Sequence, residues 1–287
     1  MGIGYQITDR HAFDYNLYFV ENGHLGLRGP KGYFGTGQYL VFTGAAQTFG
    51  RFVHKPFPEQ VGTLCQKPFL NLGVSGAGPE FFLKRPALLK KIADGEIHFM
   101  QAMSARSVSA GLFECQGNNG VVRFLSGPRK NETMMAAQAY QILLKEYGRE
   151  AHAEQVLAVQ RRWVDRCLEL ISKTETDTYL IWISANKIGE NVIESSALGE
   201  FPHFVTKAMI DEVGKACLGV IDCSYEATRP QPIRSDISGK IIEVFDRKHF
   251  PLRPEHVRAF NVYYATPQHH DYITASIIKT LAVDGRI

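Results

Sequence analysis

The sequence of 287 residues lacks an excess of charge of either sign, because 32 lysine and arginine residues stand against 29 aspartate and glutamate residues. A formal net charge of +3 gives no electrostatic basis for binding nucleic acid or an acidic membrane. No apolar run reaches the roughly 18 residues of a membrane helix, and Met1 to Arg10 lacks the basic-then-apolar pattern of a signal peptide. We therefore expect a cytoplasmic protein with no membrane or nucleic-acid partner.

Cysteine is also scarce. The five cysteines are odd in number and widely spaced, with no CxxC pair and no Cys/His cluster, which favours reduced thiols and no metal site. Residues 73–78 (GVSGAG) contain glycine but not the complete G-x-G-x-x-G spacing, and no acidic residue about 20 positions on completes a dinucleotide motif. The sequence therefore predicts neither a metal nor an organic cofactor.

Short apolar runs are what the sequence does contain. Runs of this kind are typical of buried parallel strands, and segments with helical periodicity separate most of them. The alternation predicts an α/β fold of three layers, α/β/α, around a mainly parallel, five-stranded, doubly wound sheet of the flavodoxin-like kind. The expected strands lie within residues 38–43, 69–72, 97–103, 178–184 and 218–222, and the expected helices within residues 86–93, 134–172 and 204–216.

The chain shows no long linker, so we expect a single domain over residues 1–287. Asn22-Gly23 between two apolar stretches predicts a hairpin within an N-terminal extension, residues 1–37. Residues 105–135 include two Gly/Asn-rich patches and no clear periodicity, which predicts an insertion that can serve as a lid near the site.

Two glycine-containing blocks follow the first two expected strands. Residues 44–50 (GAAQTFG) resemble the GDSxTxG block of the SGNH, or GDSL-type, hydrolases, with Ala46 in place of the nucleophilic serine and Ala45 in place of the aspartate. Residues 71–78 (NLGVSGAG) resemble that family's N-x-G-x-S-G block. There the resemblance implies that Gly76 offers its backbone N–H to an oxyanion. A glycine-containing turn can also serve packing alone.

Two later blocks depart further from the family. In residues 103–107 (MSARS), Arg106 falls near the asparagine of the G-x-N-D block, where it can bind an anion or form a structural salt bridge. In residues 263–272 (YYATPQHHDY), His270 is the nearest match to the histidine of the D-x-x-H block that precedes the last helix, and Pro267 stands where the acid is expected. The four blocks also resemble an uncharacterised bacterial family known only as a domain of unknown function.

The resemblance implies an SGNH-hydrolase-like enzyme that acts on an ester-bearing, acyl-bearing or anionic small molecule, such as a sugar derivative. The methyl group of Ala46 supplies no nucleophile. His270 is then the expected acid or base, with Arg106 and Gly76 as oxyanion donors. The residues expected to bind the ligand around them are Gly44, Gln47, Arg51, Ser75 and Ser104.

Two alternatives stay open at this point. The chain can be a catalytically inactive ligand-binding protein of the same fold. It can also be a serine hydrolase or acyltransferase whose serine has been replaced by alanine. A small molecule is the expected partner in every case, and the sequence does not indicate an oligomeric state.

Overall fold

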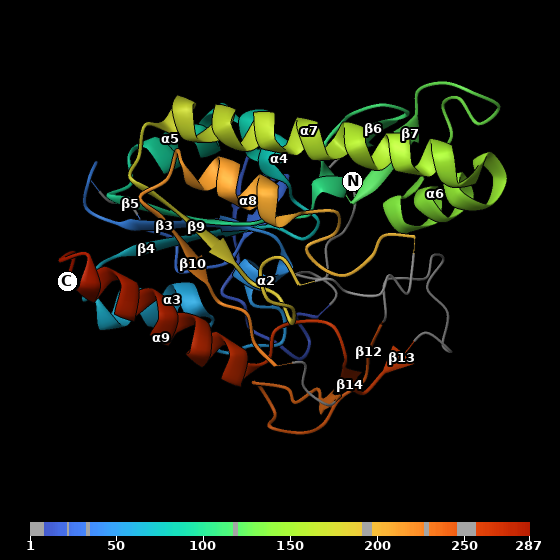
Figure 1. Ribbon diagram of the computed structural model, residues 1–287. Coiled ribbons are helices and arrows are strands. Elements are labelled where there is room, and N and C mark those ends of the chain that lie inside the picture. The colour runs from blue at the N-terminus through green and yellow to red at the C-terminus, as the bar shows by residue number, and fades with distance from the viewer. Residues whose placement is uncertain are drawn as a thin grey trace.

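The structure is a computed structural model that describes residues 9–21, 23–32, 35–116, 120–190, 197–226, 230–245 and 257–287. Its centre is a five-stranded sheet in which every neighbouring pair of strands is parallel (Figure 1). The order β4-β3-β5-β9-β10 is the flavodoxin-like 2-1-3-4-5 arrangement, so the predicted fold class is confirmed. The strands are β3 (Leu40–Gly44), β4 (Phe69–Gly73), β5 (Ile97–Gln101), β9 (Thr178–Trp182) and β10 (Gly219–Asp222).

Helices cover both faces of this sheet (Figure 1). One face carries α4 (Pro79–Leu83), α5 (Pro86–Ala93), α7 (Gly148–Thr174) and α8 (Lys207–Gly214). The other carries α3 (Phe57–Leu64) and α9 (Pro267–Val283), while the short α2 (Ala46–Phe49) follows directly on β3. None of the helices in the described ranges combines the length and the apolar character needed to span a bilayer.

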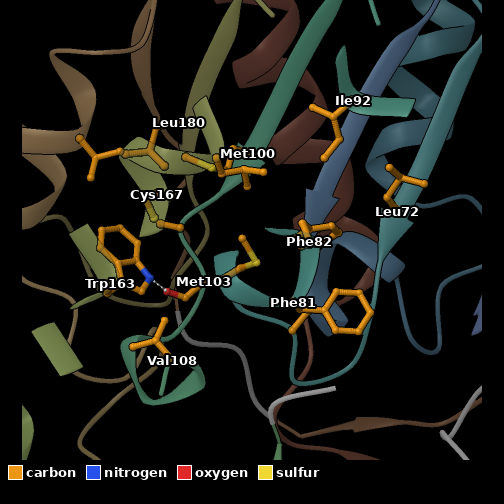
Figure 2. Packing of buried hydrophobic residues seen from close by; sticks show 14 of the residues in the cluster. Leu72, Phe81, Phe82, Ile92, Met100, Met103, Val108, Trp163, Cys167 and Leu180 are labelled. Atoms are coloured by element: carbon orange, nitrogen blue, oxygen red, sulfur yellow. Dashed lines mark hydrogen bonds between the residues drawn. The ribbon is translucent and has the colours of Figure 1, made fainter. Parts of the chain in front are cut away.

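The core under α7 also fixes the end of a central strand. Trp163 is fully buried in an apolar cluster, and its Nε1 donates a hydrogen bond to the backbone oxygen of Met103, at 2.7 Å (Figure 2). Met103 lies two residues beyond β5, so this bond holds the chain where it leaves the sheet. A Trp N–H that is buried needs such an acceptor, and here the acceptor belongs to the edge where ligands bind in this fold class.

The insertion has more regular structure than the sequence suggested. After η1 (Ala105–Ser107), three strands form an antiparallel sheet, β6 (Phe113–Gln116), β7 (Val121–Phe124) and β8 (Thr133–Met135). The expected long helix is divided into α6 (Ala136–Ile142), a π-helical turn η2 (Leu143–Tyr147) and α7. Gly148 allows this division, because its φ of 93° is available to glycine but strained for other residues.

The insertion and α6 share a small core, which is fastened to α7. Phe113, Phe124 and Tyr140 are buried in it. The amide of Gln155 on α7 accepts a hydrogen bond from the backbone N–H of Leu112 at 2.7 Å and donates one to the backbone oxygen of Ala110 at 3.0 Å. The insertion is therefore a folded unit that packs against α7.

The predicted N-terminal hairpin is confirmed as β1 (Tyr18–Val20) paired with β2 (Leu25–Leu27). Its loop spans four residues in the strand register, two more than an Asn-Gly turn requires. Directly after β2, Arg28 bridges to Asn71 of β4, so the hairpin covers that edge of the central sheet. Two further pairs lie near the C-terminus, β11 (Gln231–Pro232) with β14 (Phe260–Asn261) and β12 (Val244–Phe245) with β13 (Val257–Arg258).

Candidate functional site

The turn after β3 keeps the backbone of a strand-to-helix elbow. A Cβ atom on Gly44 would lie 2.0 Å from Oγ1 of Thr48 and 2.4 Å from Oε1 of Gln101, so only glycine fits. Oε1 of Gln101, on β5, accepts hydrogen bonds from the backbone N–H of Ala45 at 2.9 Å and from the Thr48 hydroxyl at 2.7 Å. The neighbouring strand therefore fixes the start of α2.

Ala46 occupies an apolar environment at this elbow. It is 7% exposed and belongs to a cluster that includes Phe13, Ile233, Val244 and the half-buried Tyr264. The surroundings of Ala46 thus suit a methyl group.

Gln47, the next residue, is 3% exposed, and its buried Oε1 has no hydrogen-bond partner among the described residues. Gln101 is 1% exposed, and its buried Nε2 likewise has no hydrogen-bond partner among the described residues. Buried polar atoms of this kind are uncommon in folded proteins. They leave hydrogen-bonding capacity at the elbow that the described chain does not use.

β4 packs closely against α2. The Asn71 side chain donates from Nδ2 to the backbone oxygen of Thr48 at 2.9 Å and accepts from the backbone N–H of Gly73 at 3.0 Å. A Cβ atom on Gly73 would lie 2.2 Å from the backbone nitrogen of Phe49. Asn71 and Gly73 therefore have structural roles. Gly76 has a φ of 76°, in the region that favours glycine, and Gly76 and Ser75 are half-buried.

Arg106 lies in η1, where the chain leaves β5. Ser104 and Ala105 hold this segment, since the Ser104 hydroxyl accepts a hydrogen bond from the backbone N–H of His203 at 3.3 Å and the Ala105 N–H donates to the His203 oxygen at 3.0 Å. Ser104 is therefore used in positioning the loop. Cys115 of β6 contacts the same segment, with its thiol directed at the Arg106 backbone oxygen at 3.7 Å.

The guanidinium of Arg106 has no acidic partner and no hydrogen-bond acceptor in the part of the chain that the structure describes, and its Nε is buried. Its charge acts on two nearby groups. Burial raises the pKa of Cys115 to about 12, and Arg106 opposes part of that rise. Burial likewise raises the pKa of the Tyr263 hydroxyl to about 12, again with Arg106 opposing. A half-buried cation without a counter-ion is a candidate anion site.

Arg51, in contrast, already has a carboxylate. It forms a two-pronged ion pair with Asp9, from Nε to Oδ2 at 2.7 Å and from Nη2 to Oδ1 at 3.1 Å. Nη1 donates to the Tyr264 hydroxyl at 3.0 Å, and both members of the ion pair are at most 4% exposed. The guanidinium of Arg51 thus binds a carboxylate of the same chain, and its ligand role stays a prediction.

The structure also gives His270 a different place from the one expected. It lies inside α9, is completely buried, and its Nδ1 accepts the backbone N–H of Phe57 at 3.0 Å, at the start of α3. The two rings stack with centroids 5.6 Å apart. Burial lowers the pKa of His270 to about 3, so the imidazole is neutral and caps a helix. This geometry does not support the expected acid–base role.

The start of α9 explains the difference. Thr266 caps the helix by accepting from the backbone N–H of His269 at 3.4 Å, and Pro267 is its first residue. His270 therefore lies in the first turns of α9 and not before the helix. Pro at the first helical position is a helix-start signal that the sequence already contained.

A match to a family model covers residues 3–126 and 142–253, and the family is described as a domain of unknown function (DUF6473). The chain belongs to this family. Among curated proteins no match was found.

Solved structures that resemble the chain include a lipolytic protein of the G-D-S-L family from Veillonella parvula, with 12% identity, a TM-score of 0.40, and 85% of this chain and 98% of that chain covered. The acetylxylan esterase Axe2 from Geobacillus stearothermophilus gives 12%, 0.41, 85% and 94%. A carbohydrate esterase family 2 enzyme from Corynascus thermopiles gives 8%, 0.45, 90% and 69%. The predicted resemblance to GDSL-type proteins is thus found again, and it does not bear on activity.

Proposed function

We propose that this protein binds an anionic small molecule, one that carries a carboxylate, phosphate or sulfate group, at the carboxyl edge of its central sheet. The observation that carries the proposal is the half-buried guanidinium of Arg106, which lacks a counter-ion among the described residues. Burying a cation without a partner is costly, and an anionic ligand removes that cost. This places binding without covalent catalysis ahead of the hydrolase reading.

Three features of the elbow favour binding over hydrolysis. Ala46 supplies a methyl group inside an apolar cluster. His270 is buried as the cap of α3, and Thr266 and Pro267 begin α9. Within the described residues, no group of three or more His, Cys, Asp or Glu side chains could hold a metal ion that activates water. Among the described residues, these three features favour ligand binding over acyl transfer.

Arg106→Ala is expected to weaken ligand binding by about 10- to 100-fold, because a hydrogen bond to a charged group contributes roughly 1.5–3 kcal/mol. The ligand would first be found by thermal-shift screening of carboxylated, phosphorylated and sulfated metabolites, and its affinity then measured by calorimetry. Arg161→Ala, on the exposed surface of α7, is the matched control. An Arg106→Ala protein that binds the ligand as tightly as the wild type would overturn the proposal.

Restoring the serine alone is expected to yield no esterase. Ala46→Ser supplies a hydroxyl, but His270 is buried and caps α3, so p-nitrophenyl acetate and butyrate should be hydrolysed no faster than by the wild-type chain. Burst-phase kinetics and mass spectrometry for an acyl-enzyme provide the measurement. Ester hydrolysis by the Ala46→Ser protein, or a wild-type activity that Arg106→Ala abolishes, would contradict the binding proposal and support a hydrolase function.

A further inference from the structure

The hydroxyl of Tyr140 lies in the core that the insertion shares with α6. Tyr140 is completely buried, and its ring packs against the rings of Phe113 and Phe204, with centroids 5.1 and 4.9 Å away. The hydroxyl forms no hydrogen bond with the part of the chain that the structure describes. A buried polar group without a partner is costly. Phenylalanine would avoid that cost in an apolar core, so the hydroxyl requires an explanation.

The same hydroxyl lies near Arg106. Cys115 links the two residues, because its thiol is directed at the Arg106 backbone oxygen at 3.7 Å and its side chain belongs to the same buried cluster as Tyr140. Burial raises the pKa of Tyr140 above its ordinary value of 10, and Gln155 and Arg106 oppose part of that rise. The guanidinium is therefore close enough to act on the hydroxyl, which stays protonated and can donate a hydrogen bond.

The amide of Gln155 is already used elsewhere. Its Oε1 accepts from the backbone N–H of Leu112, and its Nε2 donates to the backbone oxygen of Ala110. The buried Nε–H of Arg106 and the hydroxyl of Tyr140 thus both lack an acceptor among the described residues. Two neighbouring donors of this kind, one of them charged, suit an anionic group that has at least two oxygens.

We propose that the anionic group of the ligand lies between the Arg106 guanidinium and the Tyr140 hydroxyl and accepts a hydrogen bond from each. This rests on the anion site proposed above and adds to it a neutral donor from the insertion. A carboxylate, phosphate or sulfate group has the two or more oxygens that the arrangement requires. The insertion then supplies one wall of the ligand site.

The first test needs no ligand. Tyr140→Phe removes only a buried hydroxyl that has no partner, so its thermal midpoint is expected to equal or exceed that of the wild-type chain. A side chain that binds a ligand without helping the fold behaves in this way. A midpoint that falls by several degrees would show that the hydroxyl is bonded within the fold, for instance to Gln155, and would overturn the proposal.

The second test follows the Nε–H of Arg106 by two-dimensional ¹H–¹⁵N NMR spectroscopy, with its signal assigned by its loss in Arg106→Lys. Sodium sulfate, sodium phosphate and sodium acetate are the probes, each titrated at an ionic strength held constant with sodium chloride. At least one of them is expected to shift the wild-type signal saturably. In Tyr140→Phe, half-saturation should need about 10-fold more of the same salt, because one hydrogen bond to a charged group is lost.

Tyr147→Phe is the matched control. Tyr147 lies in η2 and packs against the same cluster, and its buried hydroxyl likewise has no partner among the described residues. Its removal should leave the titration unchanged. If the Arg106 signal titrates equally in Tyr140→Phe and in the wild type, the anion site stands and the role of Tyr140 is overturned. If none of the three salts shifts the wild-type signal, the proposed function and the role of Tyr140 fail together.

Discussion

Asp9→Ala is expected to lower the free energy of unfolding by about 3–5 kcal/mol, the usual cost of removing one partner from a buried ion pair. Asp9 and Arg51 are 2% and 4% exposed, so the guanidinium left behind cannot regain full hydration. Urea denaturation with linear extrapolation provides the measurement. Arg51→Met should cost less, because Asp9 keeps the hydrogen bond that it accepts from the Tyr15 hydroxyl at 3.5 Å.

The double variant Asp9→Leu/Arg51→Met separates the ion pair from the packing around it. Because both charges are gone, it should be more stable than Asp9→Ala. Asp211→Ala breaks the pair between Lys207 and Asp211, whose members are 59% and 53% exposed, and serves as the matched surface control. If Asp9→Ala and Asp211→Ala lower the free energy of unfolding by the same small amount, the buried Asp9–Arg51 pair contributes no more to stability than an exposed pair.

Acid is expected to destabilise the protein through two buried histidines. His98 lies between the hydroxyls of Thr43 and Thr178, at 2.7 and 3.2 Å. Burial lowers the pKa of His98, like that of His270, to about 3, from the ordinary value of 6.5. Below pH 6.5 the two histidines become protonated in the unfolded chain but stay neutral in the folded chain until the pH approaches 3. Their contribution to the free energy of unfolding is therefore complete above pH 6.5 and is lost as the pH falls toward 3.

The expected loss is about 1.4 kcal/mol per pH unit for each histidine, or about 4 kcal/mol in total for the pair at pH 5. Urea unfolding at pH 7, 6 and 5 measures it. His98→Gln and His270→Gln should each remove the contribution of one histidine, about 1.4 kcal/mol per pH unit, from the slope of the unfolding free energy against pH, whatever their effect at pH 7. His24→Gln, at an exposed residue, is the matched control. A wild-type slope in both buried variants would show that other groups govern acid sensitivity.

Four strands of the central sheet, β3, β4, β5 and β9, could be predicted because they are almost wholly buried and therefore read as continuous apolar runs. Each expected run contains or overlaps the observed strand, as residues 178–184 contain β9. The strands of the insertion were missed, although Phe113 to Gln116 alternate between buried and half-buried side chains. The sequence of these residues does alternate with a period of two, but the Gly/Asn-rich segments nearby prevented its recognition as a strand.

The surroundings of the candidate site residues could not be predicted from the sequence, for two physical reasons. Arg51 and Asp9 lie 42 positions apart, and no local pattern indicates that a carboxylate from the N-terminal segment will reach the guanidinium. His270 was chosen by residue type, whereas the start of α9 is set by Thr266 and Pro267. Arg106 was selected by its place after β5, and the structure supports that placement because strand ends depend on topology.

The length of α7 has a mechanical consequence. One uninterrupted helix of 27 residues contributes Trp163 to the main core and Gln155 to the anchoring of the insertion. Neither the main core nor the core of the insertion can lose its packing without disturbing α7, so the two cores should unfold in one cooperative transition. The segment that carries Arg106 lies between the two attachments. A displacement of the insertion is therefore transmitted to the Arg106 segment through α7, and the proposed ligand site is held rigidly.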